Sequence, residues 1–216
     1  SEVIEPRKSR SKENFAKIPI PLILLIYICA FIAYVPEISA IGNNNLIMGA
    51  HRGNSVDYIE NTLEAIVDAL ENEEYLFIEI DVQYTKDKEK IVYHDKSLFR
   101  LQKIFWKPIH SLTYAELSEI SKFHIPTYDE IMDLIRDGKK INIEIKSQGN
   151  YENDKELVDF IVNDLNERKI IHNTLLSSTS SEIIGYISET YPELKTGKIY
   201  WIHPITYLHF RPLVKN

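Results

Sequence analysis

The sequence has little positive charge and almost no cysteine. It contains 25 Lys and Arg against 32 Asp and Glu, which gives a net charge of −7. Nucleic-acid-binding proteins usually carry a basic face, so this balance argues against a nucleic-acid partner. Cys29 is the only cysteine, which excludes an intrachain disulfide and leaves the redox compartment open. The chain also lacks an initiator methionine and begins at Ser1, as expected of a processed protein or a piece of a longer one.

The N-terminal part differs in composition from the rest. Residues 1–17 are polar, with more Lys and Arg than Glu, and we interpret them as a basic tail. Residues 18–35 carry no charge, and this length is about the minimum for spanning a bilayer. We therefore expect a transmembrane helix or uncleaved signal anchor at 18–36, with a cleaved signal peptide as the alternative. The basic flank places the tail in the cytoplasm, so we expect a single-pass membrane protein whose remaining residues lie on the extracytoplasmic side.

A short linker at 37–45 precedes the part that we expect to fold, residues 46–216. There, apolar runs typical of strands alternate with amphipathic stretches typical of helices, which predicts βαβ units and a parallel sheet. We expect helices to start at Asn61, Thr113, Thr127, Asn153 and Thr179. The predicted strands are 46–50, 76–84, 91–93, 141–146, 174–177 and 198–202.

An open doubly wound sheet and a (β/α)8 TIM-type barrel both agree with this α/β pattern. Polar residues fall at the carboxyl ends of several strands and on the face opposite the aliphatic residues, which favours the barrel. A complete barrel needs about 250 residues. We therefore predict a barrel that is short of its last one or two βα units.

Three acidic residues are predicted to point toward the barrel axis. Side chains alternate along a strand, so Glu79 and Asp81 share one face of the second strand. Glu144 takes the same face of a later strand, opposite three isoleucines. Such an all-oxygen set suits a divalent cation, Mg²⁺ or Ca²⁺. The alternative is that these acids pair only with Lys and Arg.

Two histidines and two cations accompany the acids. His51 and His94 each close a predicted strand, and an imidazole with a pKa of about 6.5 can serve as general acid or base. Arg52 and Lys146 either neutralise the acids or hold an anionic substrate. A cation site, two basic side chains and two histidines together describe a phosphoester site.

The order and spacing of these motifs resemble one family, the glycerophosphodiester phosphodiesterases. The matching motifs are His51-Arg52-Gly53, Glu60-Asn61-Thr62, Glu79-x-Asp81, Thr85-x-Asp87, His94-Asp95 and Glu144-x-Lys146.

The resemblance implies a TIM-type barrel that hydrolyses small-molecule glycerophosphodiesters to an alcohol and glycerol 3-phosphate. It implies a role for each matching residue: metal ligands Glu79, Asp81 and Glu144; acid/base pair His51 and His94; phosphate contacts Arg52 and Lys146; supporting residues Glu60 and Asn61.

Two other functions stay open. The same residues could serve a lysophospholipase D-like or sphingomyelinase D-like enzyme, which the predicted membrane helix would hold near its lipid substrates. Alternatively, the incomplete barrel could be an inactive, membrane-tethered binding domain.

Overall fold

The computed structural model describes residues 21–29, 48–105, 107–136 and 138–200, in two units that divide after Leu46. In the first unit, residues 21–29 are helical. No helix within the described ranges is long and apolar enough to cross a membrane. The rest of the predicted 18–36 span lies outside them, together with the basic tail and the linker, so the anchor stays a prediction.

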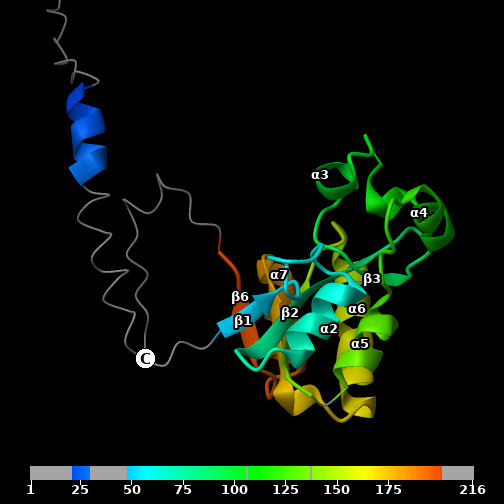
Figure 1. Ribbon diagram of the computed structural model, residues 1–216. Coiled ribbons are helices and arrows are strands. Elements are labelled where there is room, and N and C mark those ends of the chain that lie inside the picture. The colour runs from blue at the N-terminus through cyan, green and yellow to red at the C-terminus, as the bar shows by residue number, and fades with distance from the viewer. Residues whose placement is uncertain (1–20, 30–47, 106, 137, 201–216) are drawn as a thin grey trace, which may run out of the picture. The chain divides into compact units, whose positions relative to one another are not determined.

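The second unit is built on a parallel sheet (Figure 1). Its parallel strands pair in the order β1 (Met48–His51), β2 (Tyr75–Tyr84), β4 (Lys140–Ile145), β5 (Thr174–Ser178) and β6 (Thr196–Lys198). The helices that connect them are α2 (Leu63–Glu71), α5 (Tyr128–Ile135), α6 (Tyr151–Glu167) and α7 (Ser181–Thr190); a 3-10 turn (Ile171–Asn173) precedes β5. The predicted βαβ pattern is confirmed.

The aliphatic face of the sheet forms the main core. Ile78, Ile80 and Val82 of β2 are fully buried, and they belong to one cluster with apolar residues of α2, α5 and α6. Burying one such side chain is worth about 1.5–3 kcal/mol, so this face fixes which side of each strand meets the helices. Glu79 and Asp81 consequently occupy the opposite face, as predicted.

The third predicted strand is not part of the parallel sheet. β3 (Lys90–Val92) pairs antiparallel with β2. Only residues 85–89 separate the two strands, whereas a parallel crossover needs a dozen residues or more. Assigning this strand to the barrel was therefore wrong. The described residues hold five of the eight parallel strands of a (β/α)8 barrel, one fewer than predicted.

Two helix starts are confirmed and three shift. Thr113 and Thr127 form the capping boxes of α4 (Tyr114–Ile120) and α5. The other three predicted helices start one to three residues away from the predicted position, each with a side chain that accepts hydrogen bonds from the first turn. Thr62 caps α2 instead of Asn61, Asn150 caps α6 instead of Asn153, and Ser180 caps α7 instead of Thr179.

Between β3 and α5 the chain makes an insertion with its own small core. It contains α3 (Phe99–Gln102), a 3-10 turn (Ile109–Ser111) and α4, which stand apart from the helices on the sheet (Figure 1). Seven buried residues form this second core: Ile91, Tyr93, Leu98, Ile109, Leu112, Leu117 and Ile125. The sequence predicted mostly loop here, with α4 as the only helix.

Candidate active site

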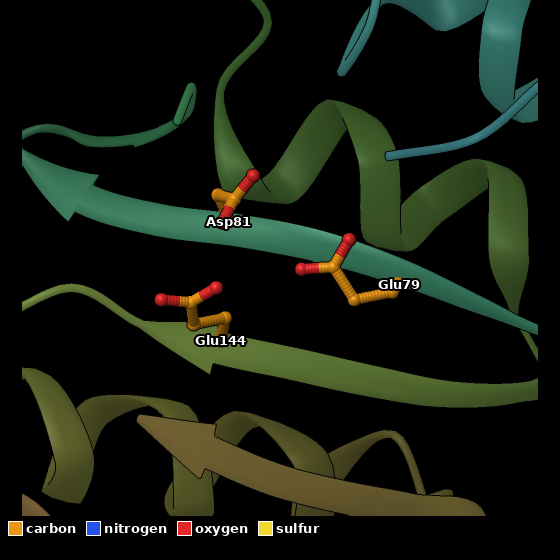
Figure 2. A group of neighbouring side chains, drawn as sticks. All are labelled: Glu79, Asp81 and Glu144. Carbon is orange, nitrogen blue, oxygen red and sulfur yellow. The ribbon is translucent and has the colours of Figure 1, made fainter. Parts of the chain in front are cut away.

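Strand register brings the three predicted acids together. His51 lies beside Glu79 across β1 and β2, and Asp81 lies beside Glu144 across β2 and β4. All three acids are buried, and one carboxylate oxygen from each lies within 4.8 Å of the others (Figure 2). Lys146 follows directly after β4, so its side chain joins the same cluster.

This cluster fits a hard divalent cation. Mg²⁺ and Ca²⁺ bind oxygen at about 2.0–2.6 Å, so oxygens on one ion lie at most about 4–5 Å apart. The oxygens of Glu79, Asp81 and Glu144 meet that limit. A set of carboxylates with no thiolate or imidazole selects Mg²⁺ or Ca²⁺ over softer metals.

Burial gives the three carboxyl groups different proton affinities. Burial, and next the charge of Asp81, raise the pKa of Glu79 to about 8. Burial also raises the pKa of Glu144. For Asp81 burial acts in the same direction, but Lys146 and Asn61 outweigh it and lower the pKa. At neutral pH the cluster therefore holds a proton on Glu79 in the absence of a cation.

The two predicted cations lie against the acids. Lys146 Nζ is 2.7 Å from Asp81 Oδ1 and 2.6 Å from Glu144 Oε1. Arg52 Nε is 3.3 Å from Asp81 Oδ2. Both cations therefore neutralise the carboxylates here, and their predicted contact with a phosphate stays a prediction.

In the turn after β1, a backbone N–H donates a hydrogen bond to the acid cluster. Arg52 adopts a positive φ of 62°, and its backbone N–H donates to Glu79 Oε2 at 2.9 Å. Gly53 follows with a φ of 74°, and a Cβ there would lie 2.7 Å from the backbone carbonyl of Ala65. Glycine is therefore required for this turn to pack against α2.

Glu60 and Asn61 support the cluster from the same loop. Asn61 has a φ of 58°, and its side-chain N–H donates to Asp81 Oδ2 at 2.8 Å. Its backbone N–H donates to the carbonyl of Arg52 at 2.9 Å. Glu60 Oε1 accepts from Arg52 Nη1 at 2.8 Å. Asn61 thus holds Asp81 and does not cap a helix.

The two histidines come from the end of β1 and from the chain just after β3. His51 Nε2 is 3.9 Å from Glu79 Oε2, and its ring is largely exposed. Burial of part of the ring, and next Arg52, lower the pKa of His51. The β2–β3 hairpin turns the chain back so that the Tyr93 N–H donates to the Asp81 carbonyl, and His94 follows. His94 Nδ1 lies 2.7 Å from Asp95 Oδ1.

Arg100 of α3 is a site residue that the sequence did not reveal. Its Nε donates to Asp95 Oδ2 at 2.6 Å, and its Nη1 donates to Glu60 Oε2 at 2.9 Å. It therefore links the partner of His94 to the partner of Arg52. Arg100 lies in the stretch predicted as loop, where no spacing rule points to it.

The glycerophosphoryl diester phosphodiesterase family profile matches residues 51–206. The chain belongs to this family. An uncharacterized protein of Mycoplasma genitalium is 32% identical over 175 residues, which cover 74% of this chain and 69% of that protein. A glycerophosphodiester phosphodiesterase of Caldanaerobacter subterraneus is 32% identical over 162 residues, covering 70% of this chain and 65% of the relative.

Solved structures of the family share the fold. The crystal structure of a glycerophosphodiester phosphodiesterase from Thermotoga maritima is 32% identical, with a TM-score of 0.60 and coverage of 75% of this chain and 65% of that one. An Oleispira antarctica phosphodiesterase, solved with its product sn-glycerol-3-phosphate, is 25% identical, with a TM-score of 0.61. The match covers 74% of this chain and 68% of that one. This chain thus spans about two thirds of these relatives, and the predicted family of phosphodiester hydrolases is confirmed.

Proposed function

We propose that this protein hydrolyses glycerophosphodiesters to an alcohol and glycerol 3-phosphate and requires Mg²⁺ or Ca²⁺. The observation that carries this proposal is the convergence of three buried carboxylates within 4.8 Å of one another. The product bound to the Oleispira relative supports the choice of substrate.

The acids and cations divide the binding of substrate between them. A divalent cation held by Glu79, Asp81 and Glu144 would polarise the phosphate oxygens as a Lewis acid. Arg52 and Lys146 supply positive charge at the same place, which offsets the repulsion between the phosphodiester anion and the acids.

The histidines handle the protons. His51 has a lowered pKa and is neutral at pH 7, so it can take the proton of the attacking hydroxyl, from water or from the substrate's own glycerol. The new phosphorus–oxygen bond forms as the bond to the alcohol breaks, and His94 gives a proton to the departing oxygen. Attack by water gives glycerol 3-phosphate directly, whereas attack by the glycerol hydroxyl gives a cyclic phosphate that water then opens to glycerol 3-phosphate. Asp95 contacts Nδ1 of His94, which leaves Nε2 as the atom that exchanges this proton.

Release of glycerol 3-phosphate from glycerophosphocholine tests the proposal. With Mg²⁺ or Ca²⁺ present, His51→Ala and His94→Ala should each lower kcat by about 10²–10⁴-fold, the usual contribution of a general acid or base. His124→Ala is the matched control, because His124 lies in the insertion and pairs with Glu130 of α5, and it should retain wild-type activity. The proposal fails if neither cation supports product release, or if His51→Ala is as active as wild type.

A lipid-directed activity is the second candidate. A human protein named lysophospholipase D is 37% identical over 70 residues, 32% of this chain. The same histidines and acids could cleave an acylated phosphodiester, including a sphingomyelinase D-type substrate, and the predicted anchor at 18–36 would hold the site near membranes. Comparing kcat/KM for glycerophosphocholine and lysophosphatidylcholine separates the two activities. Cation binding without turnover of either substrate would instead indicate a binding domain.

A further inference from the structure

One short segment of this acidic chain is basic and aromatic. Residues 96–110 contain four Lys and Arg and no Asp or Glu, whereas the whole chain has a net charge of −7. The same segment includes Phe99, Phe105 and Trp106. Its described residues include α3, near the start of the insertion.

Its phenylalanines are exposed although an apolar core lies beside them. Leu98 is fully buried in the core of the insertion, yet Phe99 is 52% exposed and Phe105 is 71% exposed. The two rings contact each other edge to face, with centroids 5.9 Å apart. Large apolar side chains grouped in this way on a surface indicate contact with a partner or a membrane.

Lys103 and Lys107 of the segment are exposed. Within the described ranges, no acidic side chain lies within ion-pair distance of Lys96, Lys103 or Lys107. Lys96 donates to the carbonyl of Ser147 and Lys103 to that of Arg100, so neither charge is neutralised by these contacts. We call Phe99, Lys103, Phe105 and Lys107 the basic–aromatic surface.

A second group of exposed apolar residues adjoins this surface. Val56, 87% exposed, is followed by the partly exposed Tyr58 and Ile59 in the loop after β1. The next residue, Glu60, pairs with Arg100 of α3, which ties this loop to the basic–aromatic surface. The loop follows His51, and Glu60 near its end pairs with both Arg52 and Arg100, so both apolar groups lie on segments that contact the candidate active site.

An anionic lipid bilayer matches both properties of this surface. A soluble acidic ligand would engage the lysines and leave the rings in water. At a bilayer surface, aromatic side chains enter the interface while Lys and Arg meet anionic headgroups. We propose that the basic–aromatic surface, together with Val56, Tyr58 and Ile59, docks onto anionic membranes and presents the active-site edge of the sheet to lipid headgroups.

Fluorescence of Trp106 tests this docking without any measurement of activity. Trp201→Phe leaves Trp106 as the only tryptophan of the full chain. Vesicles of brominated phosphatidylcholine, with and without phosphatidylglycerol, quench a tryptophan that enters the interface. Because any anchor at 18–36 would hold every variant on the vesicles equally, quenching reports on the segment itself.

We expect quenching that rises when phosphatidylglycerol is present. In the same background, Lys103→Glu with Lys107→Glu should abolish most of this rise, since each basic residue near such a surface changes affinity roughly fivefold. The control is Lys140→Glu with Lys195→Glu, which changes the charge equally at the start of β4 and just before β6. Its Trp106 fluorescence should be quenched as strongly as in the protein with all lysines intact.

Several outcomes would overturn the proposal. The proposal fails if the Trp201→Phe protein with its lysines intact shows no quenching, whatever the lysine variants show. Equal quenching with and without phosphatidylglycerol, or an equal loss in both charge-reversed variants, would also overturn it. Failure of the proposed hydrolysis would leave this result unaffected, because no substrate is present.

Discussion

A buried carboxyl group with two acidic neighbours must hold either a proton or a cation. Glu79 is that group here, since burial and Asp81 raise its pKa to about 8. Asp81 differs because Lys146 and Asn61 favour its charged form. Proton and divalent cation therefore compete for the same carboxylate, and this competition links folding, pH and metal binding.

The free energy of unfolding should report this competition. Without a cation, Glu79 of the folded protein keeps its proton up to about pH 8. Glu79 of the unfolded chain loses its proton near its ordinary pKa of about 4.5. The contribution of Glu79 to the free energy of unfolding is therefore complete below about pH 4.5. It falls as the pH rises toward 8, by at most about 1.4 kcal/mol per pH unit. Urea unfolding in EDTA from pH 5 to 8 should show a steeper fall for wild type than for Glu79→Gln. Identical pH slopes for the two proteins would contradict a raised pKa at Glu79.

The sequence was most informative for residues that share a strand face. Alternation along 76–84 and 141–146 was sufficient to predict that Glu79, Asp81 and Glu144 converge, and the structure brings them together. It was silent on Arg100, because the contact of this residue with Glu60 spans 40 positions and depends on how the insertion folds. Long-range ion pairs between irregular segments leave no periodic signal in a sequence.

At the scale of elements, the turn after β1 is constrained by two contacts. It must place the Arg52 N–H on Glu79 while passing close to α2. Both Gly53 and Gly149 have positive φ, but only Gly53 meets a neighbour, since nothing lies within 4 Å of a Cβ built at Gly149. The two glycines therefore separate the effect of backbone conformation from that of close packing.

Alanine substitution at these two glycines should have unequal costs. Gly149→Ala should lower the free energy of unfolding by about 1–2 kcal/mol, the cost of a left-handed conformation for a residue with Cβ. Gly53→Ala should cost clearly more, because its Cβ would also collide with the backbone of Ala65. Chemical denaturation of both variants measures the difference. Equal losses would show that the approach of the turn to α2 is not tight.

The errors in predicting elements have local causes. Residues 85–89 are too few for a parallel crossover, so the length of the turn already pointed to the hairpin that β2 and β3 form. Helix starts shifted where several polar residues could act as N-cap, as at Asn61 and Thr62. Asn61 is drawn away from capping by its bond to Asp81, a tertiary contact that sequence alone does not show.

At the scale of the whole molecule, the acid cluster joins β2 and β4 at the centre of the described sheet. A cation bound there stabilises the folded state by mass action, about 2.7 kcal/mol at a concentration of 100 Kd. Thermal unfolding should therefore shift upward on addition of Mg²⁺ or Ca²⁺. Glu144→Gln should reduce the shift, whereas Glu182→Gln, an exposed acid of α7, should keep it. An equal shift in all three proteins would place cation binding elsewhere.

The overall α/β pattern was predictable because each aliphatic strand face must meet a helix. The number of barrel strands was not, since a short apolar run such as 91–93 has the same composition in a hairpin and in a parallel sheet. Six residues of the insertion also gather with Ile91 of β3 in a core that is separate from the main one. Their separation becomes visible only when α3 and α4 are placed in space (Figure 1).

The ends of this insertion meet: Ile91 bridges to Thr127, and the Val92 N–H donates to the carbonyl of Pro126. Because these ends adjoin, a change in the length of the insertion need not move the sheet beneath it. The three carboxylates of the candidate site belong to the sheet, but His94, Asp95 and Arg100 belong to the insertion. A change that moves α3 would therefore also reach the partner of His94, so the proposed chemistry and the proposed docking surface are not free to change separately.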